Sequence, residues 1–231
     1  MRKKIVFFSG AGMSAESGIR TFRDSGGLWE QYDIHEIATT EAWKRNPDLV
    51  TEFYNQRRKQ IIETSPNEAH FFIAELEKYY EVSVITQNID DLHERAGSST
   101  ILHLHGNIRQ AKSSGPNHEK KLYPIDGWEL TQNDLCENGI RLRPHVVWFG
   151  ESVPALEDAI PIIEKSDFFI VIGTSLQVYP AAGLIHYAPQ TATKILIDPN
   201  LDSFAIPSDF VEIAKNATAA LPDLKKLLKI D

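Results

Sequence analysis

Short apolar runs recur along the chain, each rich in β-branched or aromatic residues and followed by polar residues or glycine. Buried parallel strands have this pattern, because helices cover them on both faces. Segments with helical spacing separate some of the runs, and strands alternating with helices indicate an α/β fold with a mostly parallel sheet. The runs are KIVFF (4–8), VSVIT (82–86), HVVWF (145–149), FFIVIG (168–173) and KILID (194–198).

Helical spacing is clearest in three segments. Residues 41–65 predict a short helix, a break near Asn46 and Pro47, and then a longer helix. Residues 66–80 predict a further helix, for which Asn67 is a suitable cap. The last residues, ALPDLKKLLKID, predict an amphipathic terminal helix.

The predicted sheet is interrupted in sequence. No second strong strand appears between the first run and Val82, and the intervening residues are mostly helical. Residues 107–144 are polar, rich in turn formers and weakly patterned. Both stretches are expected to be insertions that form an added lobe.

Composition narrows the class of protein. The 231 residues suffice for one large domain with a small insertion. The net charge of −8 argues against a general nucleic-acid binder, which needs clustered Lys and Arg. No apolar run could span a membrane, and Ile5–Phe8 is too short for a signal peptide, so we expect a cytoplasmic protein. The single cysteine, Cys136, excludes a disulfide within the chain and a four-cysteine metal site.

A glycine motif follows the first predicted strand. Gly10, Gly12 and Ala15 fit the G-x-G-x-x-G/A pattern of dinucleotide-binding turns, in which glycine lets a phosphate approach the backbone. An ordinary glycine-rich turn of an α/β protein explains the motif equally well. The acidic residue expected about 20 residues further on is missing, which disfavours a nicotinamide-dependent dehydrogenase.

Further motifs give the chain a specific resemblance, in family order and over almost its whole length, to the sirtuins, which are NAD-dependent lysine deacylases. The motifs are GAGMSAESG (10–18), GIRTFRDSGGLW (18–29), TQNIDDLHERAG (86–97), LHLHGN (102–107), RPHVVWFGE (143–151) and VIGTSLQVYPAAGL (171–184).

The resemblance implies a Rossmann-like, doubly wound large lobe that binds NAD, made of residues 1–35, 82–105 and 143–231. The inserted smaller lobe would comprise residues 36–81 and 106–142. An acylated protein or peptide would bind between the lobes, and NAD would be consumed to give free lysine, nicotinamide and O-acyl-ADP-ribose. No nucleic-acid or membrane partner is expected, and we expect a monomer.

The resemblance also implies two catalytic residues. His105, in the family's L-H-G sequence, would be the general base, since imidazole titrates near neutrality. Asn88 would act with it, and Asn88 and Asp90 would order the nicotinamide pocket. His103 is expected to pack or cap locally.

The cofactor contacts implied by the resemblance are spread along the chain. Phe22 and Arg23 would lie on a mobile cofactor-binding loop, where Phe22 would shield the reactive ribose carbon from water. The other contacts would come from Gly10, Ala11, Gly12, Ser14, Glu16, Trp29, Gln87, Ile89, Gly173, Thr174, Ser175, Asn200 and Ala217.

One pair of residues resembles the sirtuin branch that prefers acidic acyl groups. Tyr54 and Arg57 have its Y-x-x-R spacing and share one helix face, and Ala38 would leave the acyl pocket roomy. A guanidinium can pair with a buried carboxylate, which an apolar acetyl tunnel cannot accommodate. The acyl-lysine peptide would add as a strand against Val147, Trp148, Phe149, Gly150 and Glu151.

The chain departs from the family at its zinc site. Most sirtuins carry two C-x-x-C-like pairs after the L-H-G motif, whereas this chain has only Cys136 between His105 and Arg143. The neighbouring His118, Asp134 and Glu137 lack paired spacing, so no zinc is expected. The smaller lobe would instead be held by packing, through residues such as Tyr123, Trp128 and Leu135.

Three alternatives stay open beside an acidic-acyl preference. Acetyl groups could be the main substrate, with Tyr54 and Arg57 on an ordinary solvated helix face. The same ribose electrophile could be transferred to a protein as ADP-ribose. The chain could also bind NAD as a sensor without turnover.

Overall fold

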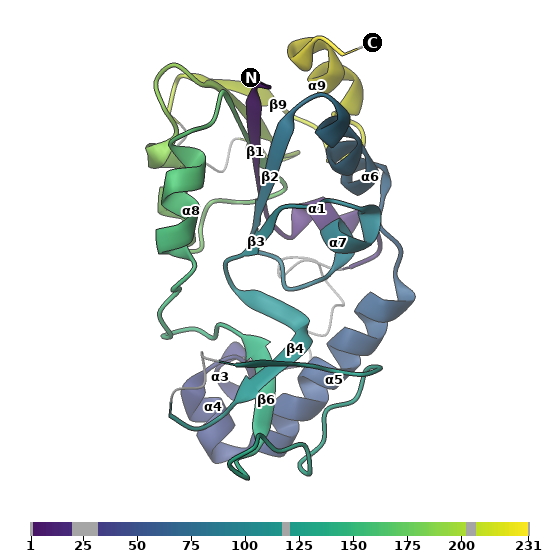
Figure 1. Cartoon of the computed structure of the whole chain (residues 1–231), viewed down its shortest axis with the longest axis vertical. Helices are drawn as coiled ribbons and strands as arrows, with labels where there is room; N and C mark the ends of the chain where they lie inside the picture. Colours follow the sequence, from purple (N-terminus) through teal and green to yellow (C-terminus); the bar gives the residue numbers. More distant parts are fainter. Residues whose placement is uncertain (1, 20–31, 117–120, 202–206, 231) are drawn as a thin grey trace.

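The computed structural model describes residues 2–19, 32–116, 121–201 and 207–230. Its larger part is a six-stranded parallel sheet with the order β3-β2-β1-β7-β8-β9 (Figure 1). The chain builds outward from β1 to β3, then returns to β7 on the other side of β1, so the strand order reverses between β1 and β7. In doubly wound sheets, ligands bind at the carboxyl ends of the strands at this point. The strands are β1 Lys4–Ser9, β2 Glu81–Thr86, β3 Ile101–His103, β7 Phe168–Ile172, β8 Thr193–Ile197 and β9 Phe210–Ile213.

Helices cover both faces of this sheet. One apolar core joins the sheet to α1 (Gly12–Ala15), α6 (Glu68–Glu75) and α9 (Leu221–Leu228). A second core joins the opposite face to α8 (Leu156–Ile163) and the 3₁₀ helix η2 (Ala181–Tyr187). In Figure 1 α8 lies on one side of the sheet and α6 and α9 on the other. The doubly wound architecture predicted from the sequence is therefore confirmed.

Short elements complete this part of the molecule. The 3₁₀ helix η1 (Leu76–Lys78) continues α6, and α7 (Leu92–Ala96) packs beside α6. The side chain of Asn67 accepts the N–H groups of Ala69 and His70, which confirms it as the cap of α6.

The smaller part lies at the other end of the molecule (Figure 1). Its described residues join three helices to a three-stranded antiparallel sheet of order β5-β4-β6. Arg58 on the longest helix is fully buried and donates to the carbonyls of Ile108 and Trp128, which ties that helix to the sheet. The elements are α3 Ile34–Ile37, α4 Thr40–Arg45, α5 Pro47–Glu63, β4 Gly106–Ser113, β5 Leu122–Pro124 and β6 Leu142–Val146.

The structure corrects two details of the sequence analysis and confirms a third. The run 145–149 is not a buried parallel strand, because only its first residues belong to β6, which pairs antiparallel with β4. Helix α6 packs on the large sheet, although its residues were grouped with the smaller lobe. The break between α4 and α5 falls at Asn46 as expected, and its side chain caps α5.

An apolar cluster that includes the single cysteine occupies the smaller lobe. Its buried members are Ala111, Ile125, Leu130, Cys136 and Leu142, with Tyr123 and Ile140 packed against them. The expected role of Tyr123 in this packing is confirmed. Trp128 and Leu135 are 38% and 50% exposed and do not belong to this cluster.

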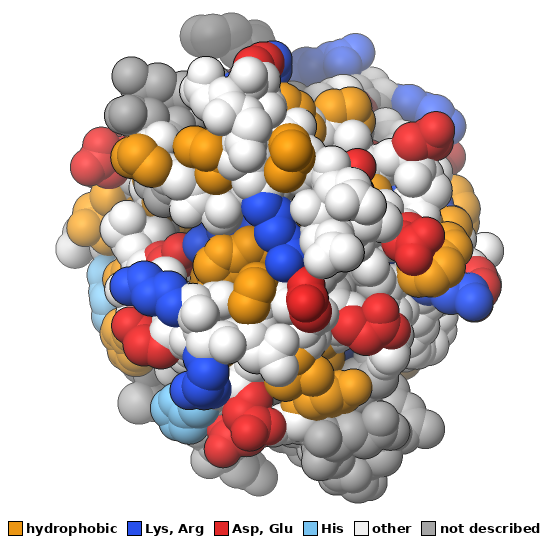
Figure 2. All heavy atoms as spheres, turned by 90° about the horizontal axis from the view of Figure 1, so that it is seen from below, with side chains coloured by type: hydrophobic (Ala, Val, Ile, Leu, Met, Phe, Trp, Pro, Cys, Tyr) orange, Lys and Arg blue, Asp and Glu red, His pale blue; other side chains and the backbone are white. Residues whose placement is uncertain are grey.

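Acidic and basic side chains are mixed on the face at this end of the molecule (Figure 2). Hydrophobic side chains lie among them, and neither charge sign dominates the described part of this face. Among the described residues, no helix combines the length and apolar character of a membrane span.

Candidate active site

A cavity of about 690 Å³ opens at the carboxyl ends of β1, β2 and β7 and extends to α5 of the smaller lobe. Its wall includes every candidate site residue that lies in the described part of the chain, so the fold brings together residues from Gly10 to Ala217. Phe22, Arg23 and Trp29 lie outside the described residues.

Two turns at the strand ends pack too closely for side chains. The Gly10 N–H donates to the Ile172 carbonyl and the Gly12 N–H to the Gly173 carbonyl. A Cβ on Gly12 would lie 2.8 Å from the Cα of Gly173, and one on Gly173, whose φ is +61°, would lie 2.2 Å from the Met13 nitrogen. Glycine at these positions therefore lets the two turns approach each other and leaves space for a phosphate beside the backbone. Helix α1 itself is only four residues long.

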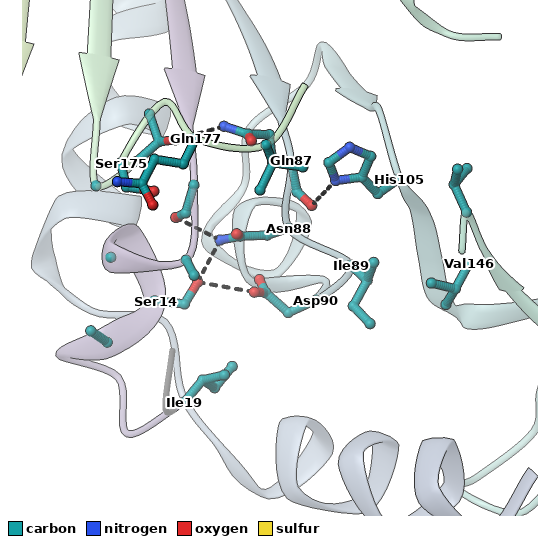
Figure 3. A pocket seen from close by; sticks show the side chains of 18 of the residues that line it. Ser14, Ile19, Gln87, Asn88, Ile89, Asp90, His105, Val146, Ser175 and Gln177 are labelled. Atoms are coloured by element: carbon teal, nitrogen blue, oxygen red, sulfur yellow. Dashed lines mark hydrogen bonds between the residues drawn. The ribbon is translucent and has the colours of Figure 1, made fainter. Parts of the chain in front are cut away.

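Three polar side chains form a buried network beside these turns (Figure 3). Asn88 Nδ2 donates to the Gly10 carbonyl at 3.0 Å and to Ser14 Oγ at 3.1 Å, and Ser14 Oγ donates to Asp90 Oδ2 at 3.0 Å. Burial raises the pKa of the Asp90 carboxyl, while hydrogen bonds from Leu92 and Ser14 oppose this change. The network fixes the rotamers of all three side chains. Both hydrogens of Asn88 Nδ2 are used within it, which leaves the amide oxygen Oδ1 as the atom of this side chain that can accept from a ligand.

His105 is oriented by the backbone of the same loop. Its Nδ1 lies 3.0 Å from the carbonyl oxygen of Gln87 (Figure 3). A carbonyl only accepts, so Nδ1 carries the proton and Nε2 keeps its lone pair. Burial lowers the pKa of this imidazole, with the Gln87 carbonyl acting in the opposite direction. His105 is therefore a neutral group in the cavity wall with a free basic nitrogen.

His103, two residues earlier, is also tied to this loop. Its Nδ1 lies 2.9 Å from the Asn88 carbonyl oxygen, and its Nε2 lies 2.7 Å from Glu94 Oε1. The sequence predicted only a local packing or capping role for His103. In the structure, His103 links the loop after β2 to helix α7.

The wall formed by the smaller lobe carries Tyr54, Arg57 and Ala38. Tyr54 and Arg57 are 1% and 8% exposed, so neither lies on a solvated helix face. Burial raises the pKa of Tyr54 to about 12, which keeps it a neutral phenol. Burial lowers the pKa of the Arg57 guanidinium, while the neighbouring Tyr54 and Asp90 raise it. Arginine keeps its charge at neutral pH, so this wall presents a buried cation to the cavity.

Tyr54 is held from behind by the segment after β6. The indole Nε1 of Trp148 donates to the Tyr54 oxygen at 3.2 Å. The guanidinium of Arg143 lies 3.5 Å from the Trp148 ring centroid and binds Glu151 through two contacts of 2.8 Å. Burial opposes the charge of Glu151, but Arg143 holds the pKa of this carboxyl below its usual range.

The backbone of residues 147–149 is largely engaged within the chain. The N–H groups of Val147, Trp148 and Phe149 donate to the His105 carbonyl, the Glu151 carboxylate and the Ala38 carbonyl. A peptide that adds as a strand here must therefore bond to the carbonyls of this segment or to groups from Gly150 onward.

At the far end of the cavity, Glu16 accepts from the backbone and the hydroxyl of Thr218, and thereby joins α1 to the loop that carries Ala217. The Asn200 N–H donates to Asp198 Oδ1. Gln87 Nε2 donates to Thr174 Oγ1 at 2.9 Å, which connects the loops after β2 and β7.

Some lining residues were missed by the sequence analysis. Asp198 follows β8 and Lys215 lies beyond β9, and the rule that ligands bind at carboxyl ends of strands could have identified both. Ile61 lies one helical turn after Arg57, a spacing that indicates the same face. The other missed residues are Ala15, Ile19, Val146, Val153, Gln177, Val178, Tyr179, Pro180, Ile197, Pro199 and Asn216.

The side chains and turns that line the cavity fit an organic cofactor. No group of three or more His, Cys, Asp or Glu side chains is arranged for a metal in the described ranges. Cys136 is buried in the apolar cluster of the smaller lobe, which does not fit a structural zinc. The glycine turns and the adjoining amide network do fit a phosphate-bearing cofactor.

Comparisons with known proteins agree with this geometry. Residues 10–180 match the model of the Sir2 family. An NAD-dependent protein deacylase of Bacteroides thetaiotaomicron is 51% identical over 98% of this chain and 98% of the relative. One from Helicobacter pylori strain J99 is 51% identical over 96% and 94% of the two chains.

Solved structures give the same result. A Sir2 homologue mutant in complex with ADP-ribose superposes with a TM-score of 0.86 at 36% identity, covering 100% of this chain and 95% of that chain. A Sir2 homologue–NAD complex superposes with a TM-score of 0.84 at 36% identity, covering 99% and 90%.

Proposed function

The chain belongs to the Sir2 family of NAD-dependent protein deacylases, and from this premise we propose that it prefers acidic acyl groups, such as succinyl and malonyl, to acetyl. The observation that carries the preference is the buried guanidinium of Arg57 beside the phenol of Tyr54, in the wall of the cavity that also contains His105.

The energetic argument concerns the carboxylate of the substrate. An isolated carboxylate costs several kcal/mol to bury, and an acyl pocket without a cation therefore excludes it. Arg57 supplies the opposite charge, and the Tyr54 hydroxyl can donate one hydrogen bond because its oxygen already accepts from Trp148. Ala38 contributes a small side chain to the same wall, which leaves room for the longer acyl chain.

The cofactor end of the cavity supports NAD as the co-substrate. NAD, when bound, would supply the ribose carbon that the acyl oxygen attacks as nicotinamide leaves, and the ribose hydroxyl that finally carries the acyl group. The glycine turns at Gly10, Gly12 and Gly173 leave space for its phosphates. Asn88, Ser14 and Asp90 form the polar pocket next to them, and we assign the nicotinamide end to this network.

His105 is the proposed general base. Its free Nε2 lies in the cavity wall and can accept a proton from a hydroxyl, while the Gln87 carbonyl holds the ring in the required tautomer. Asn88 is proposed to act with it by orienting the cofactor. Acylated proteins or peptides are the proposed partners, and the monomeric state and cytoplasmic location stay predictions.

A paired assay tests the acyl preference. The enzyme receives NAD and one peptide sequence that carries either acetyl-lysine or succinyl-lysine, and kcat/KM is measured for each. We expect the succinyl peptide to be preferred, and Arg57→Met to reduce desuccinylation by about 30-fold or more with a much smaller effect on deacetylation. Equal losses for the two peptides would contradict the assignment of Arg57 to the acyl pocket.

A further inference from the structure

His103 makes contacts of a different kind from those of His105. Its two ring nitrogens lie 2.9 Å from the Asn88 carbonyl oxygen and 2.7 Å from Glu94 Oε1. Asn107 Nδ2 lies 3.2 Å from the same Glu94 oxygen and 3.3 Å from His103 Nε2. The His103 ring is therefore enclosed between the loop after β2, helix α7 and strand β4.

The hydrogen-bond roles of the two partners determine the protonation of this ring. A carbonyl oxygen and a carboxylate both accept, so Nδ1 and Nε2 must both carry hydrogen. A neutral tautomer with hydrogen on Nδ1 could accept from Asn107 Nδ2 at 3.3 Å, but its Nε2 lone pair would then also face Glu94 Oε1 at 2.7 Å. The separation of 2.7 Å from Glu94 is that of a charge-assisted bond between an N–H⁺ and a carboxylate. The shorter contact, the one to Glu94, thus favours an imidazolium at His103, whereas His105 contacts the single acceptor Gln87 and stays neutral.

The groups around His103 agree with a cation at this position. Burial lowers its pKa, but Glu94, the Asn88 carbonyl and Asp90 raise it by more, so the net direction is upward. His93 on α7 and His145 on β6 also sense the charge of His103. Burial is the main cause that lowers the pKa of each, followed by His70 for His93 and by Lys112 for His145, and then by His103 for both. Both neighbours are therefore neutral when His103 is charged.

We propose that His103, held as a cation between the Asn88 carbonyl and Glu94, is a positioning residue for the deacylation reaction. The proposal rests on the function proposed above. Asn88 is fixed at its backbone oxygen by His103 and at its side chain by Gly10 and Ser14, and Ser14 in turn holds Asp90. His103 does not line the cavity itself, and its hydrogen bond to the Asn88 carbonyl connects it to the cavity wall.

The arrangement gives the two histidines opposite pH requirements. His105 must be deprotonated to accept a proton, so activity falls toward acid. His103 must be protonated to hold both acceptors, so activity falls toward alkaline pH as its proton is lost. Glu94 stabilises the imidazolium and therefore extends the range of activity to higher pH.

The first test reads the charge of His103 directly and does not depend on turnover. In ¹⁵N-labelled protein at about pH 6.5, the ordinary imidazole value, we expect both ring nitrogens of His103 to be protonated and only one of His105. The His103→Gln variant identifies the signal. A His103 signal from a neutral ring at this pH would overturn the proposal.

The second test measures kcat/KM for NAD against pH, with acetyl and succinyl peptides in parallel. In Glu94→Gln we expect the alkaline limb to move to lower pH, with a loss of about tenfold at about pH 8 for both peptides and an unchanged KM for the peptide. Glu164→Gln, at an exposed position after α8, makes the same change in net charge and should leave the limb in place.

The outcomes separate the two proposals. An unmoved alkaline limb in Glu94→Gln would overturn the role of His103, whichever acyl group is preferred. Preference for acetyl, with the limb moved, would overturn the acyl preference and support the role of His103.

Discussion

The indole nitrogen of Trp148 donates a hydrogen bond to the phenol oxygen of Tyr54 at 3.2 Å, although one residue follows β6 and the other lies on α5. Both side chains are at most 2% exposed. The contact fixes the phenol ring and leaves its O–H available to the cavity. It thereby connects the segment proposed to bind the peptide with the pocket proposed to bind the acyl group.

Tyr54→Phe should therefore affect both stability and acyl preference. The buried Trp148 N–H loses its acceptor, which we expect to cost about 1–3 kcal/mol in the free energy of unfolding. The acyl carboxylate loses one donor, so kcat/KM for the succinyl peptide should fall about tenfold relative to the acetyl peptide. Urea denaturation and the paired peptide assay measure the two effects.

Tyr80→Phe is the matched control. The Tyr80 hydroxyl donates to the Leu228 carbonyl at 2.7 Å, away from the cavity. This variant should lose stability while keeping the ratio of the two activities. If both tyrosine variants change the ratio alike, the effect comes from general destabilisation and the assignment of Tyr54 is wrong.

The lowered pKa of His105 predicts where kcat/KM falls on the acid side of its pH profile. Burial lowers the pKa of this imidazole, so the base stays deprotonated below its ordinary value of about 6.5. The acid limb of kcat/KM should accordingly lie below about pH 6.5, and His105→Gln should reduce kcat/KM by about 10²–10⁴. The exposed His35 provides the control, and a comparable loss in His35→Gln would contradict the assignment.

The glycine turns can be tested by adding a single methyl group. In Gly12→Ala the new Cβ would meet the backbone of Gly173 at 2.8 Å, and backbone cannot rotate away as a side chain can. We expect a loss of about 1–3 kcal/mol in stability, together with weaker NAD binding as the turn is displaced. Thermal unfolding and calorimetric titration with NAD measure both.

Gly183→Ala is its control. No atom lies within 4 Å of a Cβ at Gly183, so the variant should bind NAD normally and be equally or slightly more stable. Normal NAD affinity in Gly12→Ala would show that the close approach of the two turns is not needed for the cofactor.

The sequence predicted the elements whose signals are local. Runs such as residues 4–8 and 168–173 have few alternatives to buried strands, and Asn46 and Asn67 cap helices through their own side chains. The candidate residues at the strand ends followed from motifs, and the described ones meet at one cavity.

Contacts between distant segments were not predictable from local pattern. Strand β6 resembles a buried parallel strand in sequence, but its partner β4 determines its direction and its sheet. His103 looked like a local cap because nothing in the sequence shows that Glu94 and the Asn88 carbonyl approach its two nitrogens. Such roles depend on the tertiary fold.

The burial of His70 predicts how the stability of the fold depends on pH. It is fully buried on α6, and burial lowers its pKa from 6.5 to about 4. The unfolded chain therefore binds more protons than the native state between these values, so stability rises with pH across this window. The contribution is complete above about pH 6.5 and is lost as the pH falls toward 4. At about 1.4 kcal/mol per pKa unit, this loss is of order 3 kcal/mol in the free energy of unfolding.

His70→Gln separates this titration from the structural role of the side chain. The Nδ1 of His70 accepts the Asn67 N–H at 3.3 Å in a capping box, and glutamine is an ordinary acceptor at that position. The variant should keep the helix cap and flatten the dependence of the unfolding free energy on pH. Urea denaturation at about pH 7, 6 and 5 measures the slope for both proteins. If the slope of the variant equals that of the parent, the acid sensitivity arises from other buried histidines, of which His93 and His145 also have lowered pKa values.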